Sequence, residues 1–249
     1  MLSGKSTLAG FLLALMLLIS GCADVENYAP SGGNGVKFET TKVLPPNGNV
    51  SPSFKVGDKF EYKETMPGWG GAGTRVFVVK DMERIRGKKY YVISEDYKAK
   101  YTTPTGDART EGRQATYYFD TETGYFLKRI QGGKTITEGS GSADIDLQIG
   151  SILFGQWMLS LTDHFEMERP IESKIGDKEF YYKDRFEVVE TPLINGRKAF
   201  KVEYKIIENG TTTKKEVFWI DYEKRITVKK DVFQGATKVA EVNLISELS

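Results

Sequence analysis

Cysteine and histidine are nearly absent from this chain, which has one of each among its 249 residues. A zinc site built from several Cys and His ligands is therefore excluded, and so is a disulfide within the chain. An excess of one charge is also missing, because 35 Lys and Arg stand against 34 Asp and Glu. This balance argues against a nucleic-acid partner. With 39% apolar residues, the chain can still bury the core of one large β domain or two small ones.

The N-terminus has the layout of a secretory signal peptide, which we place at residues 1–21. Lys5 supplies a positive charge, and residues 8–19 form an uncharged apolar run of twelve, which is short for a membrane span. The run ends at Ile19-Ser20-Gly21-Cys22, which resembles the lipobox of prokaryotic lipoproteins. That resemblance implies lipidation of Cys22 and anchoring to the cell membrane on its extracytoplasmic side. The alternative is that Cys22 is one more apolar residue at the end of an uncleaved anchor.

Residues 22–53 are expected to form a flexible tether that starts at the lipidated Cys22. Four of the eight prolines and the cluster Gly32-Gly33-Asn34-Gly35 lie there, a composition typical of mobile linkers. Cleavage removes Lys5 and no acidic residue, so the mature charge is 34 − 34 = 0. Two acyl chains, rather than charge, would then hold the protein to the membrane. The sequons at Asn49 and Asn209 are candidate glycosylation sites.

Three short motifs recur in the same order and predict an internal duplication. Residues 55–59 (KVGDK) recur at 174–178 (KIGDK), 87–93 (GKKYYVI) at 196–202 (GRKAFKV), and 118–122 (YFDTE) at 219–223 (WIDYE). The offset falls along the chain, which indicates insertions in the first copy. We assign the two repeats to residues 54–149 and 171–249 of a single β domain, 54–249.

Alternating apolar and polar residues predict a mostly β fold. Phe200, Val202 and Tyr204 alternate with lysine and glutamate, which is the pattern of a strand with one wet face. Asn195-Gly196 and Asn209-Gly210 are favoured hairpin turns. About eleven strands are expected, at 55–66, 74–82, 88–100, 113–120, 125–131, 135–149, 178–191, 197–208, 213–221, 225–233 and 237–246. Successive hairpins predict a duplicated antiparallel meander that needs a strongly curved sheet or two sheets.

One stretch between the repeats breaks the β pattern. Residues 151–166 place Phe154, Trp157 or Met158, Leu161 and Phe165 at helical spacing. We therefore expect a helical segment within residues 150–170 that joins the two repeats. A helix this apolar has to be buried, most simply inside the curve of the sheet.

The lipobox, the meander and the apolar segment together resemble the lipoprotein-carrier architecture of the LolA/LolB proteins and RseB-like periplasmic sensors. The run from Trp219-Ile220-Asp221 to Val228-Lys229 is similar to a strand–turn–strand of that group. The resemblance implies a curved, open half-barrel with the helix on its concave face. It also implies that an acyl chain or another apolar ligand binds in the concavity without catalysis. The chain departs from this group because a Pro/Gly tether replaces the helix expected before the first strand.

Residues suited to catalysis are scarce. His164, beside Asp163, is the sole histidine, and no Gly-x-Ser-x-Gly motif accompanies it. Asp144 and Asp146 share one face of a predicted strand, yet their Gly/Ser-rich surroundings indicate a solvated loop. We therefore predict no enzyme activity, no cofactor and no metal site. The enzyme alternative requires polar groups clustered in a cleft with perturbed pKa values.

Five residues are the ligand-binding candidates. Trp69 lies in a Gly-rich loop that the second repeat lacks, and the other four lie in the apolar segment: Phe154, Trp157, Met158 and Leu161. The prediction is a membrane-anchored extracytoplasmic lipoprotein that binds a lipid or acyl chain in a half-barrel cavity. Its alternative is an envelope lipoprotein that contacts a protein partner and has a filled core. An exposed apolar patch outside that core would favour the alternative.

Overall fold

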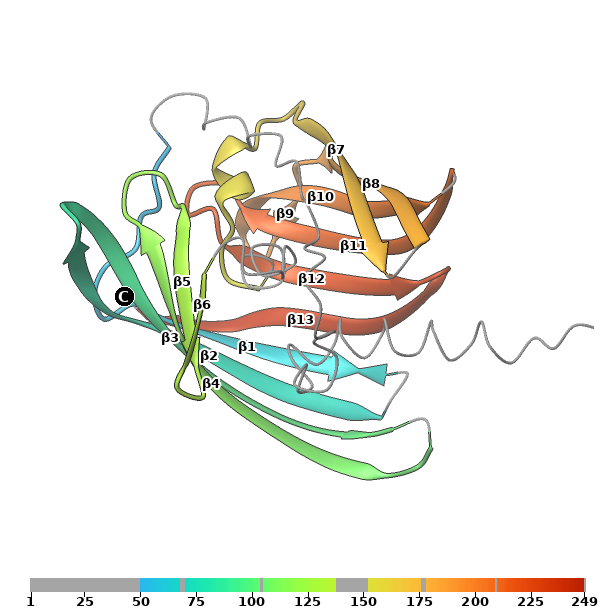
Figure 1. Cartoon of the computed structure of the whole chain (residues 1–249), viewed down its shortest axis with the longest axis horizontal. Helices are drawn as coiled ribbons and strands as arrows, with labels where there is room; N and C mark the ends of the chain where they lie inside the picture. The colour runs from blue at the N-terminus through green and yellow to red at the C-terminus, as the bar shows by residue number, and fades with distance from the viewer. Residues whose placement is uncertain are drawn as a thin grey trace, which may run out of the picture. The chain divides into compact units, whose positions relative to one another are not determined.

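The computed structural model describes residues 50–67, 70–103, 105–137, 152–175, 178–208 and 210–248, which all fall within one compact unit, Val36–Ser249. These residues form thirteen strands (Figure 1): β1 Lys59–Met66, β2 Gly71–Ile85, β3 Lys88–Thr102, β4 Ala108–Asp120, β5 Phe126–Gln131, β6 Lys134–Thr137, β7 Glu166–Ile175, β8 Lys178–Glu190, β9 Leu193–Ile194, β10 Arg197–Glu208, β11 Thr211–Asp221, β12 Thr227–Gln234 and β13 Thr237–Leu248. The fold is therefore mostly β, with two strands more than the sequence predicted.

All the strands belong to one antiparallel sheet in the order β6-β5-β4-β3-β2-β1-β13-β12-β11-β10-β8-β7, and β9 pairs with β10. The first half runs from β1 at the middle of the sheet out to β6, and the second half runs from β7 at the opposite edge back to β13. Strands β1 and β13 join the halves through a register from Lys59↔Leu248 to Thr65↔Glu241. Within the described residues β6 and β7 have no further strand beside them, so the sheet is not closed.

Two turns repeat in detail between the halves. Asp120 ends β4, and its Oδ1 accepts hydrogen bonds from the backbone N–H groups of Glu122 and Thr123. Asp221 ends β11, and its Oδ1 accepts from Glu223 and Lys224 in the same way. Each turn closes on a residue with positive φ, Gly124 at 67° and Arg225 at 58°. The first motif pair differs, because residues 55–59 lead into β1, which begins at Lys59, whereas Lys174 and Ile175 end β7 and Lys178 begins β8.

The predicted apolar helix is wrong. From Ile152 onward the segment contains one 3₁₀ helix, η3 (Gln156–Ser160), and no α-helix occurs anywhere in the part of the chain that the structure describes. Gly155 interrupts the pattern in an extended conformation (φ −144°, ψ 146°), and the chain extends again at Leu161. The segment has to cross between the two outer edges of the sheet. The spacing of its apolar side chains therefore reflects their packing against two apolar clusters of the sheet and not the period of a helix.

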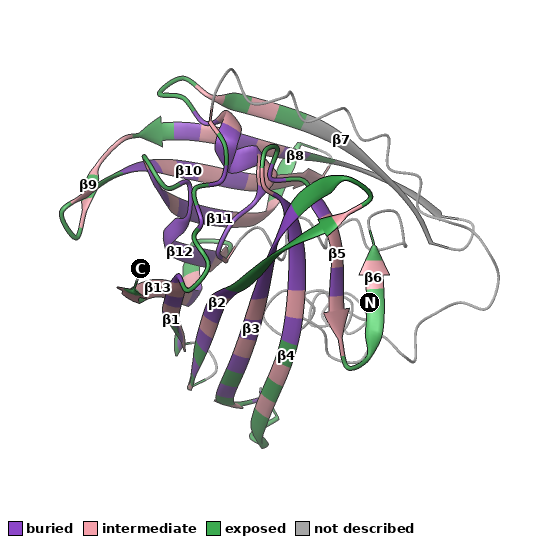
Figure 2. Ribbon diagram, turned by 90° about the vertical axis from the view of Figure 1, so that its left-hand side faces the viewer, coloured by how far each residue is buried: buried purple, intermediate pink, exposed green. Residues whose placement is uncertain are grey.

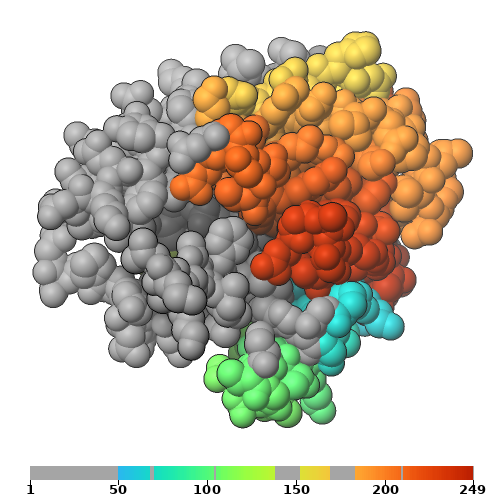
Figure 3. Space-filling view, turned by 90° about the vertical axis from the view of Figure 1, so that its right-hand side faces the viewer, coloured from blue at the N-terminus to red at the C-terminus, as the bar shows by residue number. Residues whose placement is uncertain are grey.

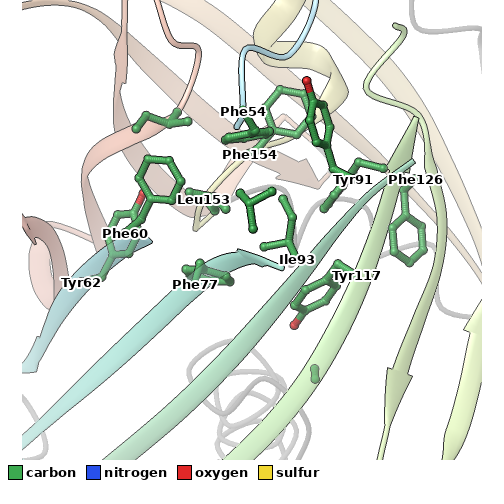
Figure 4. Close-up of a cluster of buried hydrophobic side chains, with 14 of the residues drawn as sticks. Phe54, Phe60, Tyr62, Phe77, Tyr91, Ile93, Tyr117, Phe126, Leu153 and Phe154 are labelled. Atoms are coloured by element: carbon green, nitrogen blue, oxygen red, sulfur yellow. The ribbon is translucent and has the colours of Figure 1, made fainter. Parts of the chain in front are cut away.

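Burial alternates along β1 and along the first part of β2, and striped colouring of this kind is visible in Figure 2. One face of the sheet carries two apolar clusters, which we call the inner face. The first cluster includes Phe60, Phe77 and Ile93 (Figure 4), and the second includes Phe186, Phe200 and Phe218. Register shifts such as those at Val79/Asp81 and Trp219/Ile220 bend the strands around this face.

Candidate functional site

Residues 152–161, which we call the linker segment, fill the inner face where the two clusters meet. Leu153, Phe154 and Leu159 pack into the first cluster, and Phe154 makes edge contacts with Phe54 and Phe119 at 5.6 Å between ring centroids. Trp157, Met158 and Leu161 pack into the second cluster. The segment therefore replaces water on the apolar part of both halves.

The two equivalent turns hold this linker segment. A Cβ atom on Gly124 would lie 2.7 Å from the Phe154 ring and 2.9 Å from Leu159, so only glycine allows this approach. In the second turn Arg225 Nη1 donates to the carbonyl of Leu161 at 3.1 Å. The backbone N–H of Thr227 donates to the carbonyl of Leu153 at 2.9 Å. Gly124 and Arg225, which occupy equivalent positions in the two turns, thus both contact the linker segment.

Four of the five predicted ligand residues lie together in this linker segment, and all are buried. Their exposed fractions are 0% for Phe154, 5% for Trp157, 0% for Met158 and 2% for Leu161. The indole Nε1 of Trp157 has no hydrogen-bond partner although it is buried. Trp69, Cys22, Asn49, Asn209, Asp144 and Asp146 lie outside the described residues, and His164 is exposed after η3.

The inner face changes from apolar to charged toward the hairpins that join β1 to β2, β3 to β4, β10 to β11 and β12 to β13. Figure 3 looks onto this end, where the red tip of β12 and β13 lies beside the cyan tip of β1 and β2. Directly paired residues of an antiparallel sheet share a face. Glu95 pairs with Phe77 and with Ala115, both members of the first cluster, so its carboxylate belongs to the inner face.

Glu95 is the centre of a buried ionic network in the first half. Its Oε1 accepts from Arg75 Nη1 at 2.8 Å and from Arg113 Nη2 at 2.9 Å, and its Oε2 accepts from the Tyr117 hydroxyl. Arg75 also pairs with Glu64 at 3.4 Å and lies 3.8 Å from the centre of the Tyr97 ring. Burial alone would raise the pKa of Glu95, but the two guanidinium groups and the tyrosine hydroxyl hold it below its usual value.

A second ionic network lies on β11 and β12. Lys214 and Lys230 both contact Glu216, at 2.9 and 3.1 Å, and Lys230 pairs across the sheet with Phe218 of the second cluster. Burial would raise the pKa of Glu216, yet the two ammonium groups lower it to about 2. Burial also lowers the pKa of Lys230, and Glu216 opposes that shift. The charged side of the inner face therefore extends across both halves.

Sequence patterns alone do not predict these networks, because a charged residue in a strand is expected on the wet face. The alternation of side chains along β3 nevertheless indicates on which face Glu95 lies. Glu95 falls in step with Tyr91, Ile93 and Tyr97, so a phase-based reading points its side chain inward.

The residues described here give no support to two other kinds of site. They contain no group of three or more His, Cys, Asp or Glu side chains arranged to hold a metal ion. None of their helices has the length and apolar character needed to cross a membrane.

Neither a family model nor a curated protein matches this chain. Among solved structures, a β-barrel-like protein of a domain of unknown function from Brucella abortus overlaps with a TM-score of 0.42 at 11% identity, over 78% of this chain and 97% of its own. A provisionally named exported protein with a YmcC-like fold from Bacteroides fragilis gives 0.34 at 11%, over 80% and 99%. The hypothetical lipoprotein YmcC from Escherichia coli gives 0.30 at 12%, over 78% and 90%. Structural similarities with TM-scores this low do not support any conclusion about the function of this chain.

Proposed function

We propose that this chain is a lipid-anchored extracytoplasmic protein without catalytic activity, which binds an acyl chain or another apolar ligand inside its open half-barrel. Cys22 would carry the anchor, and the ligand would lie against the apolar part of the inner face. Phe154, Trp157, Met158 and Leu161 would be the residues that the ligand contacts or displaces, with Trp69 at the entrance.

The single observation that carries the proposal is that a segment with no strand and no α-helix among its described residues fills the apolar inner face. A strand in that position would be tied to its neighbours by a ladder of backbone hydrogen bonds. The linker segment has one 3₁₀ helix of five residues without a side-chain cap, and hydrogen bonds at Leu153, Leu161 and Gln156 join it to the neighbouring turns. Its side chains also pack into both apolar clusters, and a ligand can replace these apolar contacts.

The magnitudes make such an exchange feasible. Six large apolar side chains of the linker segment are buried: Leu153, Phe154, Trp157, Met158, Leu159 and Leu161. At about 1.5–3 kcal/mol for each side chain, their complete displacement would cost about 9–18 kcal/mol. A chain of sixteen carbons recovers about 12 kcal/mol at about 0.8 kcal/mol for each methylene group. Partial displacement costs less, so an acyl chain and the linker segment are comparable competitors for the same surface.

Native mass spectrometry of the full chain, purified from host membranes, tests this function. We expect a non-covalent acyl or isoprenoid species at near-stoichiometric level, which denaturing extraction releases and identifies. The single substitutions Phe154→Ala and Met158→Ala should each change its occupancy. Protein that is empty after purification, and that also takes up no added hexadecanoic acid, would refute the proposal.

A second candidate function is that of an envelope lipoprotein that contacts a protein partner and keeps its core filled. The observation that favours it is the complete burial of Phe154 and Met158 together with the close fit at Gly124. The same experiment separates the two functions, because the second candidate requires the empty, non-binding result.

A further inference from the structure

Trp157 combines two features that conflict in the structure without a ligand. Its side chain is 5% exposed and packs against aromatic rings, with centroids 4.9 Å from Phe186 and 5.7 Å from Phe218. Its indole Nε1 is nevertheless a buried donor with no acceptor. A buried N–H group without a partner is costly, and native proteins nearly always satisfy such groups. Phenylalanine would keep an aromatic ring in this cluster without this penalty, so packing does not account for the indole N–H group.

Trp157 packs on apolar aromatic rings, and charged side chains lie beyond the Phe218 and Phe186 rings. Lys230 Nζ lies 5.0 Å from the centre of the Phe218 ring, and Lys214 Nζ lies 5.6 Å from the centre of the Tyr204 ring. The Tyr204 ring in turn lies 4.5 Å from that of Phe186. Glu216 joins the two lysines, Glu64 faces Lys230 and is held by Arg75, and Asp184 is buried on the same face. Charge on this side is thus largely paired within the protein.

We propose that Trp157 Nε1 is the hydrogen-bond donor to the carbonyl oxygen of an acyl ligand, whose chain packs on the rings of Phe186 and Phe218. This inference rests on the proposed function and names the part of the ligand that the site recognises. An acyl carbonyl is a strong acceptor that carries no net charge as an ester, so it satisfies the buried N–H without adding a buried ion. A free fatty acid and an acyl ester share this oxygen, and the experiment below tells them apart.

The experiment compares three ligands of equal chain length that differ in their oxygen atoms. The full chain, purified from host membranes into phosphatidylcholine nanodiscs, is titrated with radiolabelled hexadecanoic acid, methyl hexadecanoate and hexadecane. Trp157→Phe keeps an aromatic ring and removes the donor. Trp219→Phe is the matched control, because Trp219 is on the opposite face of β11 from Phe218 and Glu216.

We expect Trp157→Phe to weaken binding of the acid, the ester or both about tenfold, a loss of about 1.4 kcal/mol, and to leave hexadecane binding unchanged. The oxygenated ligand that loses affinity identifies the source of the carbonyl. The indole N–H resonance that Trp157→Phe removes should shift on addition of that ligand and stay in place with hexadecane.

Two results distinguish a failure of the proposal for Trp157 from a failure of the proposed function. If all three ligands bind and Trp157→Phe changes none of their affinities, Trp157 is not the donor, while the apolar site of the proposed function stands. If none of the three binds, the proposed function itself fails.

Discussion

At the scale of single residues, the unusual feature is the amount of charge placed on a buried face. Glu95, Arg75 and Arg113 are each largely withdrawn from water, with side-chain exposures of 1%, 2% and 8%. Ionic groups of this kind contribute little compared with apolar replacements, but removing one partner leaves the others buried without compensation. The network is therefore more sensitive to single substitutions than the apolar residues around it.

Glu95→Gln should destabilise the protein by about 3–5 kcal/mol at neutral pH, because two buried guanidinium groups lose their shared negative charge. Urea unfolding measures this loss. Asp96→Asn is the matched control, since Asp96 is the next residue on β3, half-exposed, and paired with the exposed Lys98. An equal effect of the two substitutions would contradict the role assigned to Glu95.

The pH dependence of this loss has a definite sign. The folded pKa of Glu95 lies below its usual 4.5, so the stability that its charge provides is present above about 4.5 and is lost as pH falls through the folded value. The difference between wild type and Glu95→Gln should therefore shrink below about pH 4.5. Unfolding curves at pH 7 and pH 3 test this, and a constant difference would contradict it.

At the scale of elements, the connection between the halves depends on one glycine. Gly124 has φ 67° and contacts Phe154 and Leu159 of the linker segment, whereas Gly132 in the β5–β6 hairpin has φ 56° and open space around it. Gly124→Ala adds backbone strain and a clash, while Gly132→Ala adds the strain alone. We expect Gly124→Ala to cost about 1–3 kcal/mol more than Gly132→Ala. Equal losses in thermal unfolding would mean that the linker segment yields freely at Phe154.

The elements also show what the sequence could predict. Strands with regular alternation and Asn-Gly turns, such as β10 and its hairpins, follow from local pattern. The linker segment does not, because its helical spacing arises from contacts with two distant clusters, and Gly155 prevents a continuous helix. The sequence does not predict β7, because Glu166–Ile175 contains Pro170 and little alternation of apolar and polar residues. Such an edge strand is defined by its pairing with β8. To predict the charged networks, one has to know which face of each strand is buried and which strands are neighbours in the sheet.

At the scale of the whole molecule, the strand order couples the two halves. The pairing of β1 with β13 joins residues near both ends of the described chain, and the linker segment packs on both clusters. Local sequence patterns do not predict this pairing. It arises because β1 begins the first meander, β13 ends the second, and both strands lie at the middle of the sheet. The same pairing makes the sheet continuous, so we expect both halves to unfold together.

Val242→Ala tests this coupling at the junction. Val242 is 3% exposed and pairs with Glu64 on β1 and with Lys230 on β12, so it contacts both halves. Its truncation should lower the opening free energy by about 2 kcal/mol. Hydrogen exchange in urea should report equal losses for β3–β4 and for β10–β11. Ile245→Ala, on the same strand at 54% exposure, should change neither. A loss confined to one half would mean that each meander holds its structure independently, and that a ligand could open one half while the other stays folded.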